Sequence, residues 1–189
     1  MKFSFASLAL PLLAAAAPTK DDNPAFGVMS SRSASPIHLL PMNAAGQHFY
    51  LGGKASTYCP LPEGKGCPPG TSTVFAPGGS GLNVMVPGGQ QVYVNPDGAL
   101  SFTQAHSAYV PPGSALGPFS YEPGENFGHY TFTGWGASGF MACPTKDQRW
   151  QVFANLQNAT VPTGNVEDCL GFSAMAPKAD SGAAAWQYI

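Results

Sequence analysis

Charged residues are scarce in this chain: Lys, Arg, Asp and Glu make up 10% of the sequence, and the formal net charge is -2. A typical soluble domain carries about 25% charged residues. The sequence has no basic stripe and therefore gives no reason to expect a nucleic acid as partner. A surface short of charge must be covered by small apolar and neutral polar groups. Such a surface suits neutral polar ligands, and we interpret it as favouring glycans.

Long hydrophobic runs are also missing. The apolar run at residues 3–13 is far shorter than the ~20 residues that cross a bilayer, but it matches a signal-peptide core preceded by Lys2. Ala14 and Ala16 supply the small residues needed for cleavage after Ala16. We therefore predict a signal peptide at residues 1–16 and a single β domain with loose ends at 17–189. The C-terminus lacks a lipid-anchor signal, so we expect a secreted protein without a membrane partner.

Helical periodicity is absent: no stretch of ten or more residues repeats its apolar positions every 3.6 residues. Instead, 23 glycines and 19 prolines separate short runs rich in β-branched and aromatic residues. These runs predict strands at residues 26–30, 37–42, 47–51, 71–75, 82–86, 91–94, 99–104, 130–135, 139–143, 150–154 and 170–174. Asn95-Pro96-Asp97-Gly98 predicts a tight turn. Residues 109–126 are expected to form a Pro/Gly loop, and residues 179–186 a terminal helical turn or a loose end.

About eleven short strands indicate an all-β single domain. Three segments, at residues 46–51, 89–94 and 147–152, share a loose pattern of polar and aromatic residues. This pattern favours a β-trefoil-like arrangement, with a two-sheet β-sandwich as the alternative.

Cysteines are few, and four follow the predicted signal peptide: Cys59, Cys67, Cys143 and Cys169. Secretion into an oxidising compartment predicts two disulfides, for which three pairings exist. We favour Cys59–Cys67 and Cys143–Cys169, because each pair closes a local loop rich in Gly or Pro. The spacing contains no C-x-x-C pair and no nearby histidine in metal-site spacing, so we expect neither zinc nor another cofactor.

Catalytic motifs are lacking as well. The four histidines are scattered, and Gly136-Ala137-Ser138-Gly139 does not match a Gly-x-Ser-x-Gly elbow. The few acids lie in predicted loops, which disfavours the carboxylate pair of a glycosidase. A Ser-His-Asp triad stays open, since its members need only be near in space. We expect no catalytic site.

Several aromatic residues are instead candidates for glycan contact. Trp135 lies between two glycines in a predicted turn, where an exposed indole could stack on a sugar ring, or could cap the core. Tyr58, Tyr109 and Tyr121 lie in predicted loops and have the same two interpretations. Asn158-Ala159-Thr160 is an N-glycosylation sequon in a predicted loop, so we predict a glycan on Asn158.

The order of these features resembles a known family. It is carried by residues 26–28, 30–35, 49–52, the Cys59 loop, 89–95, 141–144, 150–154 and 168–172. Together they resemble the PhiA family of secreted cell-wall proteins of filamentous fungi, also met as IgE-binding antigens. The C-terminal third, with its Cys-Pro pair, Trp strand and Asp-Cys pair, carries the sharpest likeness. It is also faintly similar to the C-terminal domain of yeast cell-wall proteins with internal repeats, which favours a β-trefoil-like fold.

The resemblance implies a non-enzymatic wall protein linked to asexual sporulation, in phialide and conidium development, and to stress protection. Cell-wall polysaccharide is the partner we expect. Family members tend to carry a cysteine near the mature N-terminus, which residues 19–25 lack here, and we interpret Cys67 as a relocated partner for Cys59. A secreted effector or elicitor, and a small secreted hydrolase, are the alternatives.

Overall fold

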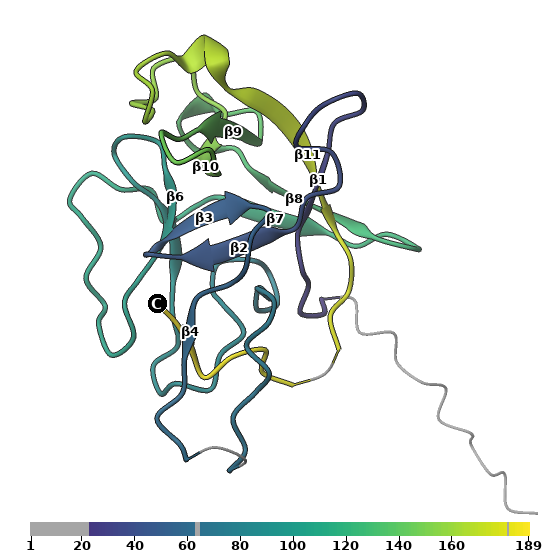
Figure 1. Ribbon diagram of the computed structural model, residues 1–189, viewed down its shortest axis with the longest axis vertical. Coiled ribbons are helices and arrows are strands. Elements are labelled where there is room, and N and C mark those ends of the chain that lie inside the picture. Colours follow the sequence, from purple (N-terminus) through teal and green to yellow (C-terminus); the bar gives the residue numbers. More distant parts are fainter. Residues whose placement is uncertain (1–22, 63–64, 181) are drawn as a thin grey trace, which may run out of the picture.

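The computed structural model describes residues 23–62, 65–180 and 182–189, so the predicted signal peptide at 1–16 lies outside the described residues. The described chain is built from short strands and two 3-10 turns, η1 and η2 (Figure 1). Their bounds are β1 Met29–Ser31, β2 Met42–Ala45, β3 His48–Leu51, β4 Thr57–Tyr58, β5 Val92–Val94, β6 Leu100–Phe102, β7 Phe119–Glu122, β8 Gly128–Phe132, η1 Gly134–Gly136, β9 Phe140–Pro144, β10 Trp150–Ala154, η2 Val166–Asp168, β11 Leu170–Ala176 and β12 Gln187–Tyr188.

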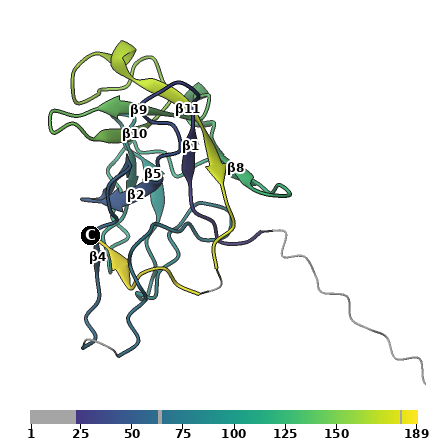
Figure 2. The ribbon, with the colours of Figure 1, turned by 45° about the vertical axis from the view of Figure 1, so that its right-hand side comes forward.

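One antiparallel sheet joins most of these strands in the order β5-β6-β3-β10-β9-β11-β8-β7, while β2 pairs with β3 and β1 with β11. The long strand β11 pairs with β9 along its first half and with β8 and β1 along its second. Strand β1 also meets the segment entering β2, because the Met42 amide donates to the Val28 carbonyl at 2.8 Å. The sheet therefore curls into a half-barrel, as the two views of the ribbon show (Figures 1 and 2).

The all-β single-domain prediction is confirmed. The β-trefoil is not confirmed, because the strand order describes one curled sheet with long irregular connections. Several predicted segments are wrong in detail. The predicted strands at 71–75 and 82–86 form only isolated bridges, among them one between Phe75 and Leu82, because these residues are held mainly by side-chain packing. Residues 37–39 form turns, and β2 begins only at Met42. The hairpin between β2 and β3 turns at Gly46 and Gln47, both in the left-handed region (φ 59° and 61°). A two-residue turn of this kind matches the twist of the flanking strands. The predicted loop at 109–126 contains β7, which pairs with β8.

A cluster of buried aromatic rings fills the interior and links the irregular segments to the sheet. Phe26 and Phe75 exchange two main-chain hydrogen bonds, and their rings stack at 5.6 Å. Tyr130 of β8 packs against both rings, at 5.3 and 5.0 Å, and its hydroxyl donates to the Gly79 carbonyl at 2.7 Å. Phe49 of β3 contacts Phe75 at 5.4 Å. Ring contacts of this kind add to the free energy of burial, so the cluster anchors segments that have few strand hydrogen bonds of their own.

The C-terminus is packed into the fold, where a helical turn or a loose end was expected. Strand β12 pairs with β4, and the Tyr188 side chain is 1% exposed. Its main chain forms two hydrogen bonds with the buried Gln90 amide, and its hydroxyl donates to the Ser72 carbonyl and accepts from the Val74 amide. Burial raises the pKa of Tyr188 to about 12, so the hydroxyl stays protonated. The sequence predicts a helical turn or a loose end at residues 179–186 because the partners of Tyr188 lie about 100 residues away in sequence.

Replacing Tyr188 by Phe should remove about 1–3 kcal/mol of unfolding free energy, because the Val74 amide and Ser72 carbonyl lose a buried partner. Denaturant titration of Tyr188→Phe measures this loss. The same change at Tyr58, whose side chain is 53% exposed, is the matched control and should stay within about 0.5 kcal/mol of the native protein. Equal effects at both positions would contradict the anchoring role of Tyr188.

Both predicted disulfides are present: Cys59 bonds Cys67 and Cys143 bonds Cys169. Cys143 is fully buried on β9, and η2 brings Cys169 to it at the start of β11. Cys67 lies instead in an exposed loop that follows β4 in the chain. The two bonds therefore differ in environment, since one closes the sheet and the other ties a surface loop.

Removing the Cys143–Cys169 bond by a double change to Ala should cost about 3.5 kcal/mol, against about 2.5 kcal/mol for Cys59–Cys67, from the loop-entropy estimate for separations of 26 and 8 residues. Limited reduction followed by alkylation and peptide mapping should label Cys67 before Cys143, because only Cys67 is exposed. Prior labelling of Cys143 would contradict the assignment of the inner and outer bonds.

Candidate functional site

Three of the four aromatic candidates lie on the surface. The side chains of Tyr58, Tyr109 and Trp135 are 53%, 68% and 49% exposed. Tyr121 is half-buried, which favours its other interpretation, a ring that caps the core. Its ring stacks on Phe26 at 4.3 Å, and its hydroxyl is buried with no hydrogen-bond partner among the described residues. Tyr121 lies on β7, within the segment 109–126 that the sequence predicts as a loop.

The backbone around Trp135 holds the indole outward. Gly134 is buried, and a Cβ there would collide with the Phe132 ring and with the Gly117 carbonyl. Trp135 follows in the left-handed region (φ 55°), which is costly for a residue with a side chain. The indole contacts Phe132 edge to face at 6.3 Å and is half-exposed. Its exposure is thus fixed by the neighbouring glycines.

The predicted glycosylation sequon lies beside Trp135. Asn158 is exposed, and Trp135 and Asn158 line the same hollow of about 200 Å³. The Asn95–Gly98 turn holds the sequon in place, because the Thr160 amide donates to the Asp97 carbonyl at 2.8 Å. A Cβ on Gly98 would lie 3.0 Å from the Ala159 Cβ, so this close approach requires glycine. The sequence named Trp135 and Asn158 separately and gave no sign that they meet.

Two contacts between serine and histidine are relevant to the hydrolase alternative. His48 Nδ1 lies 3.0 Å from Ser101 Oγ, but Ser101 is fully buried, and its hydroxyl also accepts from the Asn95 side-chain Nδ2. A buried serine cannot reach a substrate, so this contact ties β3 to β6. Among the described residues, no hydrogen bond joins His48 to an aspartate, although Asp97 acts on it through space.

The second contact, between Ser173 Oγ and His129 Nδ1, is long at 3.4 Å, and both side chains are exposed. Glu122 lies opposite His129 in the β7–β8 pair. These residues line a hollow of about 420 Å³ on an open sheet face. The arrangement lacks the enclosed nucleophile and oriented base of a hydrolase.

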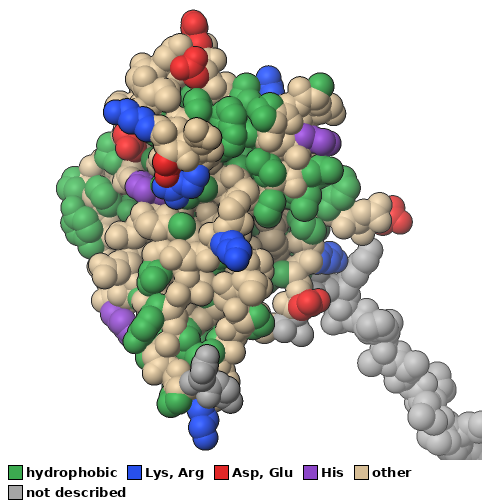
Figure 3. Space-filling model, in the orientation of Figure 1, with side chains coloured by type: hydrophobic (Ala, Val, Ile, Leu, Met, Phe, Trp, Pro, Cys, Tyr) green, Lys and Arg blue, Asp and Glu red, His purple; other side chains and the backbone are tan. Residues whose placement is uncertain are grey.

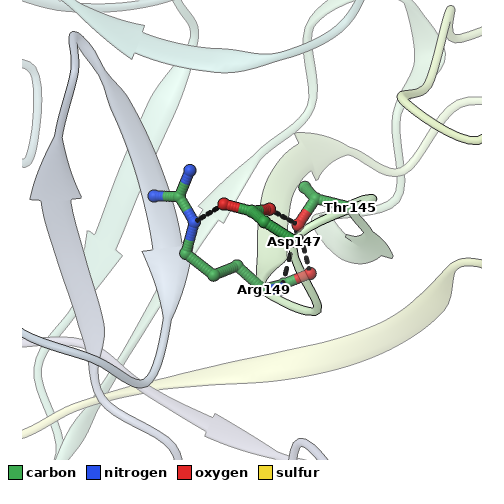
Figure 4. Close-up of polar contacts among 3 residues, drawn as sticks. All are labelled: Thr145, Asp147 and Arg149. Atoms are coloured by element: carbon green, nitrogen blue, oxygen red, sulfur yellow. Dashed lines mark hydrogen bonds and ion pairs between the residues drawn. The ribbon is translucent and has the colours of Figure 1, made fainter.

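Charged side chains lie mainly in exposed turns. Asp147 and Arg149 form an ion pair at 2.7 Å in the β9–β10 hairpin, and Asp147 also accepts from the Thr145 hydroxyl (Figure 4). The hydrogen bonds from Thr145 and Arg149 lower the pKa of the Asp147 carboxyl. The Arg149 guanidinium also lies over the Tyr50 ring at 4.0 Å. On the face shown in Figure 3, charged side chains are few and scattered among neutral groups.

A hollow of about 560 Å³ was not predicted from the sequence. Residues near β1 and β2, residues 69–74 and the C-terminal segment line it, with hydroxyl groups at Thr71 and Ser72. Four segments far apart in sequence build it, so no local signal could have found it. Within the described residues, no group of His, Cys, Asp and Glu could hold a metal ion, and no helix has the length and hydropathy of a membrane span.

Comparison with known proteins identifies the family. The PhiA-like secreted protein family matches residues 26–189. The chain belongs to this family. A secreted protein from Arthroderma benhamiae, described as uncharacterized, is 49% identical over 185 residues, covering 95% of this chain and 94% of that protein. No solved structure matches the chain. The predicted resemblance and the prediction of a secreted protein are thereby confirmed, while family membership alone assigns no ligand.

Glycosylation of Asn158 remains a prediction, and we expect the secreted protein to lose mass on treatment with peptide N-glycosidase. Changing Thr160 to Ala should abolish that loss. Thr163→Ala is the matched control, because Thr163 is exposed three residues further along and belongs to no sequon. Equal masses before and after treatment of the native protein would contradict the prediction.

His48 makes stability depend on pH. Burial lowers the pKa of His48 below its usual value of about 6.5, although attraction to Asp97 offsets part of that effect. The unfolded chain therefore binds a proton at His48 more readily than the folded protein does. The free energy of unfolding is unaffected by this group above pH ~6.5, and it falls as the pH drops from there toward the folded-state pKa of His48. His48→Gln should flatten the decline in denaturant midpoint between pH 7.5 and 5. An unchanged slope would rule out His48 as its source.

Proposed function

We propose that this protein is a non-enzymatic component of the fungal cell wall that attaches to neutral wall polysaccharide through exposed tyrosines. Membership of the PhiA-like secreted family supports a wall location, because the resemblance implies wall proteins. The same resemblance extends the proposal to asexual sporulation, in phialide and conidium development, and to protection against stress. A strain without the gene should then form fewer normal conidia.

The observation that carries the polysaccharide contact is the exposure of Tyr58 and Tyr109 on a surface with little charge. Tyr58 lies on β4, whose partner β12 is anchored by Tyr188, and Tyr109 lies in the connection between β6 and β7. An aromatic ring with a hydroxyl offers an apolar face and a polar edge, which suits a neutral sugar. Trp135 is not assigned to this contact, because the sequon asparagine shares its hollow.

Pull-down with insoluble β-glucan, chitin and mannan tests the proposal. We expect binding to at least one polymer, with roughly a tenfold loss for Tyr58→Ala or Tyr109→Ala, about 1.4 kcal/mol for each ring. Leu116→Ala is the matched control, since Leu116 is exposed on the same connection as Tyr109 but is not aromatic. Binding should also tolerate added salt, because neutral contacts are not screened.

Two results would contradict the proposal. One is the absence of binding to every wall polymer. The other is binding that disappears at high salt and is unchanged in the Tyr58 and Tyr109 variants, since this would indicate an electrostatic contact elsewhere.

A further inference from the structure

The hollow between Trp135 and Asn158 has an occupant that the chain itself would supply. We propose that the first N-acetylglucosamine of a glycan on Asn158 lies in this hollow and stacks on Trp135. In this arrangement the exposed indole is a docking face for the protein's own glycan. The proposal is independent of wall binding, which is assigned to other side chains.

Geometry is the first support. Asn158 and Trp135 both line the hollow, so a sugar bonded to the Asn158 amide begins its path at the wall of the hollow itself. The sequon cannot swing freely, because the Thr160 amide is bound to the Asp97 carbonyl and Ala159 packs against Gly98. The attachment point is therefore held beside the indole in every folded molecule.

Size and lining are the second support. The hollow of about 200 Å³ is smaller than the roughly 300–1,000 Å³ of ordinary ligand sites, so it suits one sugar ring rather than a polysaccharide chain. Pro96, Leu156 and Ala159 contribute apolar surface, on which the apolar face of a pyranose ring can be buried. The exposed Asp97 at the rim can accept hydrogen bonds from sugar hydroxyls.

Backbone strain at Trp135 is the third support. A residue with a bulky side chain is costly in the left-handed region, where glycine is the usual choice. The surrounding fold nevertheless holds the indole there, in edge-to-face contact with Phe132 and at the wall of the hollow. A sugar ring stacked on the indole would shield it from water and give this strained, half-exposed side chain a partner.

Hydroxyl-radical footprinting of the secreted glycoprotein tests the proposal residue by residue. Oxidation of Trp135 should be several-fold slower in the native glycoprotein than in Thr160→Ala, which lacks the sequon but keeps Asn158 and its backbone contacts. Trp150 and Trp186 serve as internal controls and should oxidise equally in both proteins. Thr163→Ala, which keeps the sequon, should protect Trp135 as the native protein does.

Two further arms sharpen the result. Trimming the glycan to a single N-acetylglucosamine should retain most of the protection, because the first sugar makes the contact. Loss of the sequon should lower the melting temperature, and this shift should shrink when Trp135 is already Gly, a change that suits the left-handed backbone.

Three outcomes would overturn the proposal. One is an unoccupied Asn158 in the secreted protein. Another is equal oxidation of Trp135 with and without the glycan, which would mean that the sugar projects into solvent. The third is protection of Trp135 only after wall polysaccharide is added, which would assign the indole to the wall and leave Asn158 unrelated to it.

Discussion

The contact between Phe26, Phe75 and Tyr130 is the constraint on which the rest of this fold depends. Residues 71–91 contain no strand longer than an isolated bridge, yet they hold Val74, Phe75, Leu82 and Val86 in buried positions. Full burial of one such side chain contributes about 1.5–3 kcal/mol, and deleting a buried phenylalanine typically costs about 3–5 kcal/mol. The rings thus supply the cohesion that main-chain pairing does not supply in these segments.

This use of aromatic residues shapes the surface. Many rings are buried in the core, and charged groups are few, so the exterior is mostly neutral with a small number of exposed rings in fixed places. Trp135 is fixed by its glycine neighbours, and Tyr58 by the pairing of β4 with the anchored C-terminus. Rings that are displayed on a rigid frame lose little conformational entropy on binding, which favours a binding or structural role.

Local signals in the sequence predicted much of the fold. Alternating apolar residues and turn signals located β3, β5, β6, β9, β10 and β11, and the Gly/Pro-rich loops suggested both disulfides. The failures are non-local. Strand β7 is flanked by prolines and forms because it pairs with β8. Tyr188 is buried because its main chain and hydroxyl form hydrogen bonds with Gln90 and Ser72. In the same way, Trp135 and Asn158 were each identifiable, but only the fold brings them to one hollow.

Native-state hydrogen exchange measures the central claim, that the ring cluster makes the irregular segments part of one cooperative unit. The amides of Phe26 and Phe75, which bond each other's carbonyls at 3.1 and 2.8 Å, should exchange with the same free energy and denaturant dependence as amides of β9 and β10. Exchange of Phe26 and Phe75 through a smaller opening, while β9 and β10 remain protected, would contradict the account. It would mean that the sheet folds alone and the aromatic cluster is secondary.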